Sequence, residues 1–179
     1  MRGYRREGFH AFSENDGFSM FENQRSALDQ AIKKQADDYI LNVNREEYIQ
    51  HLIGEFSIEP IEIHKDSLSV STYEEMIPAE MHPRDYFMDR GGSYPRDVLV
   101  FHLPFTGDLQ LLKVRASTYS MSAPLINIEQ GCITFKMINF NLDAQRIKQE
   151  SDNIIRSLES QNGYLTRDIE NFNSSLQQH

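Results

Sequence analysis

The sequence has 179 residues, of which 39% are hydrophobic and 25% charged, a composition typical of one globular domain rather than of a disordered chain. Asp plus Glu number 27 and Lys plus Arg number 18, so the net charge of −9 disfavours long-range attraction to nucleic acid or to an anionic membrane. No run approaches the roughly 20 apolar residues that span a bilayer, and the single Cys132 excludes an intramolecular disulfide and a multi-cysteine metal site. We therefore expect a reduced, cytoplasmic protein that makes no membrane contact.

The first twenty residues predict an irregular N-terminal arm, because glycines interrupt the aromatic side chains without a steady period. From Asn23 onward apolar residues recur every four positions, which predicts an amphipathic helix carrying Leu28, Ile32, Ala36 and Ile40. Asn44 stands three residues before Glu47, a variant of the capping box that predicts the start of a second, shorter helix. Pro60 cannot continue that helix.

The hydrophobic period then shifts to two, which predicts strands over 61–64 and 68–71 joined by a hairpin turn at Lys65–Ser67. Residues 74–97 contain three prolines and a Gly-Gly pair, and they predict a long loop of the kind that often carries function.

Two further pairs of strands are expected after that loop. The apolar run Val98–Phe101 predicts a central strand, and residues 109–112 predict the strand that returns from it. A last hairpin is expected from Leu125 to Phe140, with its turn at Gln130-Gly131. About six strands with short connections indicate a mostly antiparallel sheet.

The segment 143–179 has the clearest pattern, because its apolar residues repeat with a spacing of eleven. That spacing equals 3.67 residues per turn and keeps one apolar stripe on an almost straight helix. The helix would be roughly 50 Å long, more than a six-stranded sheet needs, so we expect part of the stripe to bind a partner or a second copy. Asn162-Gly163 is a favoured helix stop and leaves a kink or a helical hairpin open. The stripe comprises Ile147, Ile154, Leu158, Leu165, Ile169, Phe172 and Leu176.

Common catalytic and cofactor motifs are absent from the sequence. It has no Gly-x-Gly-x-x-Gly or P-loop for phosphates, no Gly-x-Ser-x-Gly nucleophile elbow and no His-Glu-x-x-His zinc motif. Cys132 has no neighbouring base and His102 lies in an apolar strand, so both are interpreted as core residues. We therefore expect no cofactor and a role other than catalysis.

A metal-dependent hydrolase is the first alternative. His82, Asp85 and Asp89 are spaced by three and four residues, so on a helix they would share one face. With His64 or His102 they would offer the mixed nitrogen and oxygen ligands that suit a divalent metal. A solvated loop explains the same residues without a metal.

Nucleic-acid binding through the N-terminal arm is the second alternative. The arm interleaves Arg2, Arg5 and Arg6 with Tyr4 and Phe9, a pattern that can stack on single-stranded nucleic acid. The acidic net charge favours a solvated tail instead.

Residues from about 95 to 179 resemble the N-terminal module of large bacterial anti-phage-type proteins whose C-terminal part is a TIR-type or restriction-nuclease-like effector. The resemblance lies in Leu111–Pro124, in the hairpin around Gly131, in Asp143-Ala-x-x-Ile-Lys-x-Glu and in Asp168-Ile-Glu-x-Phe-Asn-x-x-Leu. Ala116 stands where that family has proline. The family helix runs on past the position of His179 into an effector, so the resemblance implies a sensing, scaffolding or assembly role with an effector domain or subunit as partner.

Arg115, Ser117 and Thr118 are polar residues beside the proline-marked turn that ends at Pro124. They are candidates either for recognising a ligand or for fixing the turn through hydrogen bonds.

The sequence as a whole predicts an α+β protein with an arm (1–20), a body (21–142) and a long C-terminal helix (143–179). The body is expected to hold N-terminal helices and the mostly antiparallel sheet. The function that we expect is a non-catalytic interaction module of bacterial immunity, acting by self-association or by docking with a partner.

Overall fold

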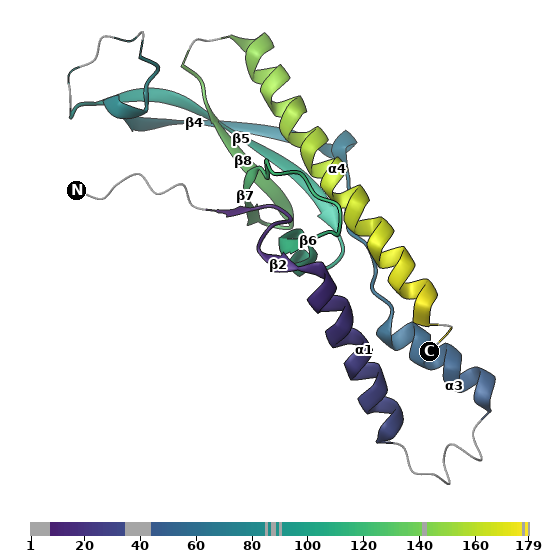
Figure 1. Ribbon diagram of the computed structural model, residues 1–179. Coiled ribbons are helices and arrows are strands. Elements are labelled where there is room, and N and C mark those ends of the chain that lie inside the picture. Colours follow the sequence, from purple (N-terminus) through teal and green to yellow (C-terminus); the bar gives the residue numbers. More distant parts are fainter. Residues whose placement is uncertain are drawn as a thin grey trace. The chain divides into compact units, whose positions relative to one another are not determined.

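The computed structural model of the chain describes residues 8–34, 44–84, 86, 89, 91–140, 143–176 and 178. Its helices are α1 (Gly17–Lys33), α3 (Arg45–Phe56) and α4 (Ala144–Leu176), and Figure 1 shows them with the strands. The strands are β1 (Phe9–His10), β2 (Asn15–Asp16), β3 (Glu62–Ile63), β4 (Ser69–Pro78), β5 (Ser93–Thr106), β6 (Val114–Arg115), β7 (Leu125–Glu129) and β8 (Cys132–Ile138). The protein therefore has the expected α+β fold.

The chain divides into two compact units. The sheet unit contains 62–106 and 124–158, together with the start of the chain as far as Phe9. The helical unit contains 10–61, 107–123 and the chain from Glu159 onward, so α4 contributes residues to both. This division differs from the expected arm, body and helix, because the contacts that define each unit join segments far apart in sequence.

The six-stranded sheet is built around β5, the longest strand. Its order is β1-β7-β8-β5-β3, and β4 also pairs with β5. The pairs of β5 with β3, β4 and β8, and of β7 with β8, are all antiparallel. Phe101 stacks on its cross-strand neighbour Phe135 at 4.8 Å between ring centroids, beside the fully buried Leu103 and Ile133. These apolar pairs form the core of the sheet unit.

The β7–β8 hairpin is confirmed, and its turn explains why. Gln130 and Gly131 both have positive φ angles, 51° and 77°. This is the conformation of the two-residue hairpin turns whose twist matches that of the strands, and glycine adopts it without strain.

The predicted hairpin between 61–64 and 68–71 is wrong. β3 and β4 do not pair with each other; they follow one another along β5, with Glu62 opposite Thr106 and Ser69 opposite His102. The 3₁₀ turn at Lys65–Ser67 connects them without reversing the chain.

The loop between the strands is shorter than the predicted 74–97, because β4 continues to Pro78 and β5 begins at Ser93. Both strands tolerate their prolines. Pro95 lies beyond the last paired residue of β8, since Asp97 already bonds to Asn139 after the end of that strand. Pro78 ends a strand at the edge of the sheet, a position where proline is accepted.

Residues 109–112 form a 3₁₀ turn rather than the expected returning strand. The carboxylate of Asp108 accepts the backbone N–H of Gln110 at 2.9 Å and caps this turn. Leu111 and Leu112 are buried although they are not in a strand.

Residues 8–20 contain β1, β2 and the start of α1 rather than the irregular structure expected for this part of the arm. Phe12 is buried and donates its backbone N–H to Leu112 O at 2.6 Å. Asp16 caps α1 by accepting the N–H of Ser19 at 3.0 Å, so the helix begins six residues before Asn23. Residues 1–7 lie outside the described residues, as does the predicted helical stretch around Ala36 and Ile40.

α3 and α4 begin where the sequence predicts. Asn44 accepts the N–H of Glu46, and Asp143 accepts the N–H groups of Gln145 and Arg146 at 3.0 Å. α4 runs unbroken through Asn162-Gly163, so a helical break at this pair is wrong. The side chain of Asn162 donates to Ile61 O at 2.9 Å instead of ending the helix.

The core of the helical unit consists of side chains from α1, α3 and the end of α4: Leu28, Leu52, Phe56, Phe172 and Leu176. Asn173 of α4 adds a two-point hydrogen bond to the backbone of Ile58. No helix in the described part of the chain is long and apolar enough to cross a membrane.

Candidate interaction site

β4 forms one side of the sheet, and the described residues place no strand on its outer side. The direction of its backbone groups follows from two hydrogen bonds of β5. Asn139 donates to Asp97 O on the β8 side, whereas His64 donates to Pro104 O on the β3 side. Because bonding direction alternates along an antiparallel strand, even-numbered residues of β5 bond to β4 and odd-numbered residues bond to β8.

The same alternation fixes β4. Its odd-numbered residues face β5, since Tyr73 is opposite Val98 and Ser71 is opposite Val100. The N–H and C=O groups of the even-numbered residues therefore point away from the sheet. These groups belong to Val70, Thr72, Glu74 and Met76. We call this row of four residues the open edge.

The side chains of the open edge combine exposed apolar groups with polar ones. Val70 is 49% exposed and Met76 is 58% exposed, and the exposed Thr72 and Glu74 lie between them. An exposed, long strand with apolar side chains is a template for pairing with another chain. Figure 1 shows β4 beside β5 in the long ribbon of the sheet unit.

Two carboxylates lie opposite each other next to the open edge. Glu74 pairs with Asp97 across the β4–β5 ladder, in a position where the side chains share one face. Both are exposed. Like charges in this position are mildly destabilising, so the side chain of Glu74 is not stabilised by its cross-strand neighbour on β5.

The other face of β4 is held by hydrogen bonds. The Tyr73 hydroxyl donates to Glu75 at 2.9 Å and accepts from Lys136 Nζ at 3.1 Å. Ser71 Oγ lies 2.8 Å from His102 Nε2. His102 is half-buried rather than fully in the core, and so is Cys132. These bonds fix the side chains of β4 on this face while its outer backbone groups stay open.

The α4 stripe is mostly covered within the chain, which corrects the expectation that it waits for a partner. Five of its seven residues are buried: Leu158, Leu165, Ile169, Phe172 and Leu176. Phe172 stacks on Phe21 at 5.1 Å between centroids, and both lie in the core of the helical unit. The helix is longer than the sheet requires because α4 contributes residues to both units.

Ile147 and Ile154, the other two stripe residues, are half-buried. They line an open groove of about 800 Å³ in the sheet unit, together with Pro124–Asn127 of the β7 region and Thr134–Phe140 of the β8 region. Arg146 and Glu150 on its rim form an ion pair at 2.9 Å. Because these two charges pair with each other, neither is left to select a partner of opposite charge.

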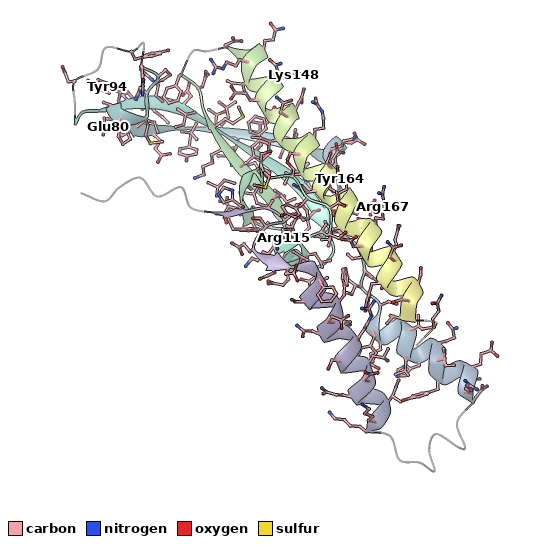
Figure 2. The ribbon with its side chains drawn as sticks, viewed as in Figure 1. Glu80, Tyr94, Arg115, Lys148, Tyr164 and Arg167 are labelled. Carbon is pink, nitrogen blue, oxygen red and sulfur yellow. The ribbon has the colours of Figure 1, made fainter. Side chains whose placement is uncertain are left out.

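Arg115, Ser117 and Thr118 are not brought together as a ligand site. Ser117 donates its backbone N–H and its hydroxyl to the carboxylate of Asp168, at 2.6 and 2.8 Å. Arg115 lies 3.8 Å from Asp16 and over the ring of Tyr119, and Figure 2 labels it beside the start of α1. Thr118 is exposed. Ser117 and Arg115 therefore hold the turn.

The metal alternative requires a helix over 82–89, and the described residues of that segment form none. His82 is buried, with Nδ1 at 3.0 Å from Pro78 O and its ring 5.0 Å from that of Phe140. Asp89 instead gives its N–H to Tyr94, which Figure 2 labels, and Asp85 lies outside the described residues. No group of three His, Cys, Asp or Glu able to hold a metal occurs among the described residues.

The nucleic-acid alternative rests on Arg2, Tyr4, Arg5 and Arg6, which lie outside the described residues. Phe9, the last aromatic residue of that pattern, is half-buried in β1.

The open edge was not predicted as a site from the sequence. The strand was expected to end at residue 71, because the three prolines and the Gly91-Gly92 pair of residues 74–97 predicted a loop. Ser71-Thr72 and Glu74-Glu75 are consecutive polar pairs, so the alternation does not continue through this strand and gave no signal for its length. Comparisons with known protein families, with curated proteins and with solved structures gave no match.

Proposed function

We propose that this protein is a non-catalytic assembly module that associates with another polypeptide chain edge to edge along β4. The observation that carries the proposal is the open edge, with four consecutive outward-facing residues between Val70 and Met76. Strand addition to a sheet edge is a recurring mode of recognition, in which the backbone supplies affinity and alternate side chains supply specificity. Five of the seven residues of the α4 stripe are buried within the chain, which favours the open edge over the stripe as the surface for association.

We further propose a sensing or scaffolding role in a bacterial anti-phage-type defence system, in the cytoplasm, with an effector domain or subunit as a partner. The resemblance of residues 95–179 to modules that precede effectors supports the role. The single cysteine is consistent with a reducing compartment.

Light scattering at a series of concentrations tests association through β4. We expect the mass of the wild-type chain to rise above the monomer value of 20.9 kDa as concentration increases. The variant Thr72→Pro should stay monomeric, because proline removes an outward N–H without removing a bond to β5. Thr72→Ser keeps both that N–H and a side-chain hydroxyl and serves as the matched control, which should associate like the wild type.

A strict monomer at every concentration would rule out self-association. Association of Thr72→Pro equal to that of the wild type would show that the contact lies elsewhere.

A further inference from the structure

We infer that the partner at the open edge is a second copy of this chain, paired antiparallel about a two-fold axis at Tyr73. This inference rests on the proposed function and adds the identity and the register of the partner. A two-fold axis requires a surface that is complementary to itself. The order of side chains along β4 meets that requirement in one register.

The register at Tyr73 places apolar residues opposite apolar residues and carboxylates opposite hydroxyl groups. Val70 lies opposite the partner's Met76, and Thr72 lies opposite the partner's Glu74. Symmetry repeats both pairs. The exposed apolar residues at each end of the open edge thus meet each other, and each carboxylate meets a hydroxyl that can donate a hydrogen bond to it.

Backbone direction agrees with this register. Residues that exchange two N–H···O bonds in an antiparallel pair must both point toward the partner. Val70, Thr72, Glu74 and Met76 all do, so the pairing would form about eight backbone hydrogen bonds between the two copies. Tyr73 would face its own symmetry mate in a pair without backbone bonds, with its ring beside the partner's ring.

Neighbouring registers are less favourable, because they place the Glu74 carboxylate opposite a like charge or an apolar side chain. An axis at Glu74 would place that carboxylate opposite its own copy. An axis at Thr72 would place Glu74 opposite the partner's Val70. Only the axis at Tyr73 keeps both glutamates, Glu74 and Glu75, opposite hydroxyl groups, since Glu75 then lies opposite the partner's Ser71.

The dimer would be closed and weak. Each copy uses its β4 edge once, so a two-fold pair leaves no second β4 edge for growth. A single pair of short strands buries less than the roughly 1,200–2,000 Å² of a stable interface, so we expect reversible association that depends on concentration.

Cysteine cross-linking in a Cys132→Ser background tests the register. Tyr73→Cys should form a disulfide dimer under mild oxidation, because Cα atoms in such a pair are about 4.5 Å apart. Ser71→Cys alone should not, because its two copies would lie about 14 Å apart along the strands. The double variant Ser71→Cys/Glu75→Cys should cross-link, since the cysteine at position 71 of one copy then lies opposite the cysteine at position 75 of the other. Reduction should return every dimer to monomer on a denaturing gel.

Cross-linking of Ser71→Cys alone would place the axis elsewhere and overturn the inference. A mass that rises with concentration without cross-linking of either Tyr73→Cys or the double variant would also overturn it, and association through β4 would stand if Thr72→Pro stayed monomeric. A monomer by light scattering would remove both. The double variant keeps the test valid if Tyr73→Cys fails to fold.

Discussion

Asn173 permits a quantitative test of how α4 stabilises the helical unit. Its Oδ1 accepts Ile58 N–H at 3.0 Å, and its Nδ2 donates to Ile58 O at 2.8 Å. Replacing Asn173 by alanine removes both bonds, each of which contributes about 0.5–1.5 kcal/mol. Alanine is the better helix former by about 0.6 kcal/mol, which offsets part of the loss. We expect Asn173→Ala to lower the free energy of unfolding by about 0.4–2.4 kcal/mol.

Urea unfolding followed by circular dichroism measures this loss. Asn171→Ala is the matched control, because Asn171 is exposed on the same helix and gains the same helix propensity. The difference between the two variants then isolates the hydrogen bonds. We expect a lower urea midpoint for Asn173→Ala and a midpoint at or above the wild type for Asn171→Ala. Equal midpoints in the two variants would refute the view that this side chain holds the segment after α3.

Three further changes have predicted outcomes. Gly163→Ala should raise the free energy of unfolding by about 0.5–1 kcal/mol in urea, because a Cβ there meets nothing within 4 Å and α4 is continuous; destabilisation would argue for a kink. Asp97→Lys should raise the thermal midpoint, with a gain of about 0.2–1 kcal/mol, because it replaces the like-charge pair with Glu74 by an opposite-charge pair; an unchanged or lower midpoint would contradict this. The backbone N–H of Ser19 lowers the pKa of Asp16 below its ordinary 3.8, so its contribution is present above that pH and is lost as the pH falls through the lowered value. Asp16→Asn should therefore lose less stability than the wild type in acid titration, and parallel curves would contradict the cap.

The sequence predicted those elements whose signals are local. The turn at Gln130-Gly131 and the caps at Asn44 and Asp143 act through neighbouring residues, and all three are confirmed. The pairing of β3 and β4 was not predictable in this way, because both pair with β5, whose first residue, Ser93, comes 15 residues after the end of β4. A short connection suggests a hairpin, but here the chain passes through a 3₁₀ turn and continues in the same direction along β5.

The candidate site was harder to predict than the fold. The apolar period of α4 correctly predicted a helix but not its surroundings, since burial of Leu165 or Phe172 depends on helices distant in sequence. The openness of β4 depends on which strands lie beside it, and a periodic pattern does not specify the neighbours of a strand. Ser117 was a candidate for fixing the turn, but its acceptor Asp168 could not be predicted because it lies 51 residues away.

Amide hydrogen exchange, followed residue by residue by NMR at low and high protein concentration, tests association along β4 most directly. The account predicts that exchange at Val70, Thr72, Glu74 and Met76 slows as the mass rises above that of the monomer. In Thr72→Pro the remaining three should exchange fast at every concentration. Fast exchange at all four residues of the wild type, while its mass doubles, would contradict the account.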